Sequence, residues 1–219
     1  MKNKIKILLI IFFTPLVFGN SLSVYSNDCL YELVEEDLDQ FVINSFTQYN
    51  KDIDRKTILK FIEVCDSFNL RPNIKTLTAQ ICLESGAKHT IQDTLLESNS
   101  SALGICQVTT QTAFLFLKNI ISKDDRLLKK LGGTKYRNIL EIEDPDERRE
   151  GIKKWLSNET NNIIIYGYMM GRFMNKYKDI RKSLVVYAHG PLFLKNNKNI
   201  DSDTYVRSVM NIKKVLNEN

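Results

Sequence analysis

Apolar residues recur every three or four positions along most of this chain, and this spacing restricts it to helical folds. One series contains Leu38, Phe41, Val42 and Phe46, and a second occupies residues 58–68. A helix of 3.6 residues per turn places such residues on one face. A half-buried strand would instead require strict alternation of apolar and polar residues, which is hard to find in this sequence. We therefore predict an all-α protein.

A single carboxylate interrupts the apolar face of the helix that is predicted to start after Pro72. Leu77, Ile81 and Glu84 follow one another at spacings of four and three residues, so the glutamate shares a face with apolar residues. Gly86 marks the expected end of this helix. An ionised carboxylate buried without a partner costs several kcal/mol, so the protein must pair Glu84, protonate it or use it.

Further helices are predicted downstream, separated by glycine-containing or polar breaks. The charged residues 118–157 favour a solvated surface. The expected breaks and starts are a loop at residues 88–101, a stop at Gly132-Gly133, a helix start at Asp144-Pro145, a break at Gly190-Pro191 and the start of a last helix near Ser202.

The first 26 residues have the pattern of a secretory signal peptide. Three lysines precede the apolar run Ile7–Phe18, and small residues follow it. The run is shorter than the roughly 20 apolar residues that span a bilayer, and Pro15 interrupts it. We predict cleavage between residues 19 and 26, which leaves residues 27–219 as one exported domain without a stable membrane anchor. The expected location is the periplasm or the cell-wall space.

Removal of this segment changes the charge of the protein. Residues 1–26 contain three lysines and no acid, so the net charge falls from +5 to +2. Because the remaining chain shows no concentrated basic cluster, we do not expect it to bind nucleic acid. A mild positive charge favours an anionic cell-wall polymer only weakly.

The cysteines leave two alternatives open. An exported chain with Cys29, Cys65, Cys82 and Cys106 permits two disulfides in any of three pairings. Alternatively, Cys82 and Cys106 are small buried hydrophobic residues that do not pair. The two histidines have no ligand-like spacing to the cysteines, so we expect neither a metal nor another cofactor.

Five motifs occur in an order that is similar to that of a known enzyme family. Glu84-Ser85 is followed by SNSSALGICQVTTQTA at residues 98–113, by Asn162-Ile163, by VVYAHGP at residues 185–191 and by Tyr205-Val206. Between about residues 70 and 210 the chain thus resembles the soluble lytic transglycosylases of glycoside hydrolase family 23. The resemblance implies a lysozyme-like helical domain with a substrate cleft.

The chain departs from the family pattern at four positions. Ser101, Cys106, Thr110 and Ala188 stand where the family has glycine, methionine, proline and asparagine. Ala188 removes a polar group from the cleft wall that the family motif builds. Cys106 exchanges one apolar sulfur-containing residue for another.

The resemblance implies that Glu84 is the catalytic residue of a peptidoglycan lytic transglycosylase. As a general acid it would protonate the leaving oxygen of the bond between N-acetylmuramic acid and N-acetylglucosamine. As a carboxylate it would then take the proton of the muramic acid 6-hydroxyl, which closes a 1,6-anhydro ring. Such an acid must stay protonated near neutral pH, and burial raises the pKa of a carboxyl group. Leu77, Ile81 and Ile105 are candidates for the apolar wall around it.

Four polar residues are expected to support Glu84. Ser85 and Ser98 would orient the glutamate or an N-acetyl group of the sugar. Gln107 would hydrogen-bond the substrate. Tyr187 would hold the glutamate or polarise the intermediate.

Two alternative functions remain open. A hydrolytic muramidase of the same fold would use a second carboxylate, Asp93 or Glu97, to activate water. A catalytically inactive wall-binding or assembly protein is favoured by Ala188 and Ser101 and opposed by the retained glutamate. The expected partner in each case is the glycan strand of peptidoglycan. The role is either wall turnover or opening of the wall for a secretion or conjugation apparatus.

Overall fold

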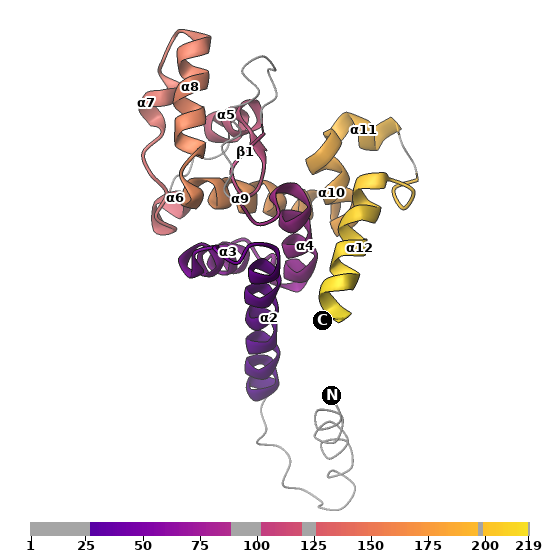
Figure 1. Ribbon diagram of the computed structural model, residues 1–219. Helices are drawn as coiled ribbons and strands as arrows, with labels where there is room; N and C mark the ends of the chain where they lie inside the picture. The colour runs from indigo at the N-terminus through magenta and orange to yellow at the C-terminus, as the bar shows by residue number, and fades with distance from the viewer. Residues whose placement is uncertain (1–26, 89–101, 120–125, 197–198, 219) are drawn as a thin grey trace, which may run out of the picture. The chain divides into compact units, whose positions relative to one another are not determined.

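The computed structural model describes residues 27–88, 102–119, 126–196 and 199–218, and this part of the chain is almost entirely helical (Figure 1). The all-α prediction is confirmed at this level. The chain divides into two units, residues 1–39 and residues 40–219, with the boundary inside α2. The description below concerns the second unit. The predicted signal peptide, the side chain of Cys29 and most of the loop predicted at residues 88–101 lie outside the described residues.

The elements follow one another along the chain with short connections between most of them. They are α2 (Asn27–Tyr49), α3 (Arg55–Ser67), the 3₁₀ turn η2 (Arg71–Asn73), α4 (Ile74–Ser85), β1 (Ala102–Leu103), β2 (Val108–Thr109), α5 (Thr110–Asn119), α6 (Arg126–Lys130), α7 (Arg137–Leu140), α8 (Pro145–Leu156), α9 (Glu159–Tyr177), α10 (Ile180–His189), α11 (Pro191–Asn196) and α12 (Thr204–Glu218).

Helix α9 contributes the largest share of the core. Its residues 161–167 are all buried, and the helix packs against α3, α5, α8 and α10. A side chain at Gly167 would place its Cβ 2.2 Å from the side chain of Val64, so the glycine allows α3 to approach closely. Phe61 of α3 lies 6.4 Å, between ring centroids, from Tyr166 of α9. The apolar series at residues 58–68 therefore faces α9, as its helical spacing requires.

The helix ends agree with the capping signals in the sequence. The side chain of Asp144 accepts hydrogen bonds from the backbone N–H groups of Asp146 and Glu147, and this starts α8 where it was predicted. Helix α12 starts at Thr204, close to the predicted position. The chain breaks at Gly190 as predicted, but α11 begins at once, because a proline is well suited to the first position of a helix.

A short antiparallel hairpin interrupts the helices, and the sequence pattern did not predict it. Ala102 pairs with Thr109 and Leu103 pairs with Val108. Two-residue strands are too short for an alternating pattern to be detected. The turn between them has a positive φ at Gly104 (72°) and at Gln107 (51°), which is the conformation that glycine adopts most easily.

Asn162 of α9 clamps this hairpin turn. Its Nδ2 donates to the carbonyl oxygen of Leu103 at 2.9 Å, and its Oδ1 accepts from the backbone N–H of Cys106 at 2.9 Å. A Cβ at Gly104 would lie 2.5 Å from the Asn162 amide, so only glycine leaves room for this clamp. The asparagine side chain is fully buried. The asparagine of the motif Asn162-Ile163 therefore serves to hold the hairpin turn.

Helix α12 packs along α4, and α10 also contacts α12 (Figure 1). This packing brings residues near the end of the sequence beside the helix that carries Glu84. Among the described helices, none combines the length and the apolarity that crossing a bilayer requires.

The described cysteine side chains are free thiols. Cys65, Cys82 and Cys106 are all buried, and burial raises the pKa of Cys82 to about 12. A thiol with such a pKa stays protonated and unreactive at neutral pH. The alternative in which Cys82 and Cys106 are small buried hydrophobic residues therefore agrees with the structure.

Replacing Asn162 with alanine should lower the free energy of unfolding by about 2–4 kcal/mol, because two buried backbone groups lose their partners. The matched control is Asn175→Ala, which removes an exposed asparagine from the same helix. Urea unfolding of both variants measures the difference. Equal free energies of unfolding of the two variants would show that the hydrogen bonds of Asn162 to the hairpin turn do not stabilise the protein.

Candidate functional site

Glu84 lies in the last turn of α4, at the point where the helix meets the hairpin. Gly86 ends the helix with φ 63°, and its N–H donates to the carbonyl oxygen of Cys82. Leu77 and Ile81, which precede Glu84 on its face, are fully buried, and Glu84 itself is half-buried. The carboxyl group therefore sits at the edge of the core.

The hydroxyl group of Tyr205 donates a hydrogen bond to Oε1 of Glu84. Tyr205 lies in the first turn of α12, which packs along α4, and is separated from Glu84 by 121 positions in the sequence. The predicted helical face of α12 explains why the tyrosine points toward α4. Within the described part of the chain, the carboxyl group is thus held by a neutral partner and not by a cation.

Gln80 sets the direction of this hydrogen bond. The side chain of Gln80 is fully buried one turn before Glu84. Its Oε1 accepts from the Tyr166 hydroxyl at 2.8 Å, and its Nε2 donates to the Tyr205 oxygen at 3.0 Å. Since the Tyr205 oxygen accepts a hydrogen bond from Gln80, the Tyr205 hydroxyl hydrogen is available for the hydrogen bond to Glu84. Helices α4, α9 and α12 thereby meet in one continuous network of hydrogen bonds.

Burial raises the pKa of Glu84 above the value of an exposed glutamate. The hydrogen bond from Tyr205 stabilises the charged carboxylate and lowers the pKa, but burial is the larger effect. The pKa of Tyr205 is also raised, first by burial and then by the nearby charge of Glu84. The tyrosine therefore keeps its proton and remains a donor in both charge states of the glutamate.

Tyr187 fastens α10 to the hairpin turn. Its hydroxyl donates to the carbonyl oxygen of Cys106, and its ring lies 5.6 Å from the ring of Tyr166. We predicted that Tyr187 would hold the glutamate, but the hydroxyl that donates to Glu84 belongs to Tyr205. The only signal for Tyr205 in the sequence was the closing Tyr-Val motif. Tyr187 lies close enough to Glu84 for the carboxylate charge to raise its pKa, although burial is the main cause.

Ser85 and Gln107 make local contacts. The Ser85 hydroxyl donates to the carbonyl oxygen of Ile105 at 2.7 Å, which ties the end of α4 to the hairpin. The Nε2 of Gln107 donates to the carbonyl oxygen of Gly104 at 2.8 Å, within its own turn. Both side chains thus stabilise the hairpin beside Glu84. Ser98 and the two candidate second carboxylates, Asp93 and Glu97, lie outside the described residues.

A histidine and an aspartate border the site at the start of α12. The Nε2 of His189 lies 3.2 Å from Oδ2 of Asp203, and its ring lies 4.4 Å from the ring of Phe193. The ring centroid of Tyr205 is 6.3 Å away. Asp203 also accepts a hydrogen bond from the N–H of Val206, which caps α12. This contact joins the break after α10 to the helix that carries Tyr205.

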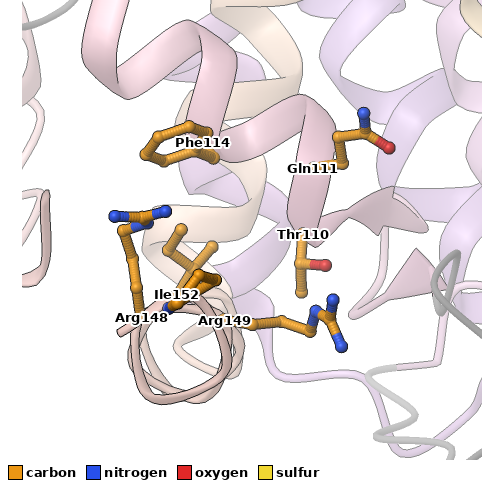
Figure 2. A pocket seen from close by; sticks show the side chains of 7 residues that line it. Thr110, Gln111, Phe114, Arg148, Arg149 and Ile152 are labelled. Carbon is orange, nitrogen blue, oxygen red and sulfur yellow. The ribbon is translucent and has the colours of Figure 1, made fainter. Parts of the chain in front are cut away.

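A separate pocket of about 310 Å³ lies between α5 and α8 (Figure 2). We call it the α5–α8 pocket, and Glu84 is not among its lining residues. It is lined by Thr110, Gln111, Phe114, Pro145, Arg148, Arg149 and Ile152.

Within the described ranges, no group of three or more histidine, cysteine, aspartate or glutamate side chains is placed to hold a metal ion. Comparison of the chain with protein-family models, with curated proteins and with solved structures found no match.

Replacing Tyr205 with phenylalanine should raise the pKa of Glu84 further, because it removes the hydrogen bond that favours the charged carboxylate. The measurement is a pH titration of the Glu84 carboxyl carbon by NMR. Tyr177→Phe, near the far end of α9, is the matched control and should leave the titration unchanged. A lower midpoint in Tyr205→Phe would contradict the proposed direction of the bond.

Replacing Glu84 with glutamine should make the protein relatively more stable as the pH rises. Because the pKa of Glu84 is raised by folding, the stability that its protonated form provides is fully present below the pKa of the unfolded chain, about 4.3, and is lost as the pH rises through the folded value. The free energy of unfolding of Glu84→Gln minus that of the wild type should therefore increase as the pH rises across this window, which urea unfolding at several pH values measures. Glu143→Gln, an exposed control, should show no such trend.

Proposed function

We propose that this protein is a peptidoglycan lytic transglycosylase with a lysozyme-like helical domain, in which Glu84 acts first as general acid and then as base. The observation that carries the proposal is the half-buried carboxyl group with a raised pKa, held on one oxygen by Tyr205. The ordered motifs from Glu84 to Tyr205 support it. The proposed substrate is the bond between N-acetylmuramic acid and N-acetylglucosamine.

In the first step Glu84 donates its proton to the leaving glycosidic oxygen. A carboxyl group can do this near neutral pH only if its pKa is raised, which burial achieves here. Since Oε1 accepts the hydrogen bond of Tyr205, the proton of Glu84 is carried on Oε2. Tyr205 therefore determines which oxygen faces the substrate. The bond between the sugar carbon C1 and the leaving oxygen breaks as the proton is transferred.

In the second step the same carboxylate accepts a proton. The 6-hydroxyl oxygen of the muramic acid attacks C1, and its proton passes to Oε2 of Glu84. This forms the 1,6-anhydro ring, restores the protonated acid and consumes no water. Tyr205 remains a donor throughout, so it stabilises the carboxylate that exists between the two steps.

The hairpin forms one wall of the proposed substrate cleft. Ser85, Tyr187 and Asn162 each bind a backbone group of residues 103–106, so this wall is anchored from three helices. A rigid wall supports catalysis, because the acid must stay within hydrogen-bond distance of the bond that it cleaves. The polar residues predicted to contact the substrate would thus act mainly by holding this wall.

We further propose that the protein is exported through its N-terminal signal segment and acts in the periplasm or the cell-wall space. Its partner there is the glycan strand of peptidoglycan, cleaved either for wall turnover or to open a passage for a secretion or conjugation apparatus.

Glu84→Gln should lower the release of soluble muropeptides from purified peptidoglycan by about 10²–10⁴-fold, the usual contribution of a general acid. Glu143→Gln should digest the wall like the wild type. Mass spectrometry of the wild-type products should show 1,6-anhydro ends. Reducing muramic acid ends would instead indicate hydrolysis, and binding to the wall without any product would indicate an inactive wall-binding protein. Turnover that survives in Glu84→Gln would overturn the assignment of the acid.

A further inference from the structure

Among the residues that the structure describes, the lining of the α5–α8 pocket contains two guanidinium groups and no carboxylate. The guanidinium carbon of Arg148 lies 5.0 Å from the ring centroid of Phe114, and its Nη1 donates to the carbonyl oxygen of Ile142 at 2.8 Å. Two partners thus hold Arg148 in place. The ammonium group of Lys118 lies 5.5 Å from the same ring. Phe114 is therefore surrounded by positive charge.

Arg149 is the more available of the two cations. Its Nη1 lies 3.4 Å from Asp146 on the same helix, and the aspartate side chain is 86% exposed. An ion pair this exposed is weak, so a ligand can compete for Arg149. Figure 2 shows the Arg149 guanidinium on the Thr110 side of the pocket and that of Arg148 beside Phe114. The two cations therefore border the same cavity from different sides.

Besides the two arginines, the described lining has a polar part, Thr110 and Gln111, and an apolar part. Phe114, Pro145 and the buried Ile152 form this part of the wall. A volume of about 310 Å³ lies at the lower end of the range for ligand pockets. The pocket therefore suits a small ligand that combines an anionic group with a short apolar part.

We propose that the α5–α8 pocket binds a carboxylate carried by a short peptide. A guanidinium group pairs with a carboxylate through two parallel hydrogen bonds, and the apolar wall accepts a small aliphatic side chain beside it. The first turn of α8 carries Asp146 and Glu147, and Asp144 caps it. These acids repel a polyanion such as a nucleic acid more strongly than they repel a single carboxylate, which favours the peptide.

We identify this peptide as the stem peptide attached to the glycan strand, and this identification rests on the proposed function. The pocket lies close to the proposed cleft along the chain. Ile105 is bonded to Ser85, and Thr110 of the pocket follows Ile105 by five residues, a span of at most about 18 Å. The Thr110 edge of the pocket therefore lies within about 18 Å of the hairpin residue that contacts Ser85, a distance that an extended peptide of about five residues spans.

Isothermal titration of the full chain with the dipeptide L-Ala-D-Glu, the first two residues of wall stem peptides, tests the pocket without any glycosidic bond. Wild type should bind it saturably, and Arg149→Gln should weaken binding about tenfold. Arg207→Gln, an exposed arginine on α12, is the matched control and should bind like wild type. The dipeptide with both carboxylates amidated should bind at least about tenfold more weakly than the free acid.

Three results would overturn the inference: no saturable binding, equal binding by Arg149→Gln, or tighter binding of an oligonucleotide than of the dipeptide. The titration is repeated with Glu84→Gln, which keeps the pocket intact. Dipeptide binding by a wild-type protein that releases no muropeptides would support the pocket while removing the transglycosylase proposal. Muropeptide release without dipeptide binding would remove the pocket alone.

Discussion

The hydrogen bond between Tyr205 and Glu84 joins the first turn of α12 to the last turn of α4, and the rest of the site depends on it. Burial alone would favour a protonated glutamate without determining which oxygen carries the proton. The buried Gln80 orients the tyrosine, and Tyr166 orients the glutamine. Burial thus raises the pKa of the carboxyl group, and three neutral side chains give it a defined direction.

The hairpin is the second constraint, because it lies against the helix that carries the glutamate. Its turn is held by Asn162 from α9, by Ser85 from α4 and by Tyr187 from α10. Ser85 and Tyr187 were predicted to support Glu84 or the substrate, and in the structure their hydroxyl groups donate to backbone carbonyl oxygens of the turn. Polar residues near Glu84 thus hold in place the turn that lies beside it.

Most of the helical structure could be predicted from local patterns. Apolar spacing identified the faces of α3 and α4, Asp144 and Pro145 identified the start of α8, and Gly86 identified the end of α4. These signals act within a few residues, so they can be seen in the sequence. The hairpin could not be predicted, because strands of two residues form only when partners elsewhere hold the turn.

The sequence by itself determined that the protein is helical and that Glu84 lies on an apolar helix face near a helix end. Only the tertiary structure decided which tyrosine holds it, because Tyr205 and Tyr187 are both far from Glu84 in the chain and both occur in the resemblance motifs. The packing of α12 along α4 places the Tyr205 hydroxyl at Glu84. The Tyr187 hydroxyl instead donates to the hairpin carbonyl oxygen of Cys106. Spacing along one helix encodes a face, whereas the contact between two helices depends on how their whole surfaces pack.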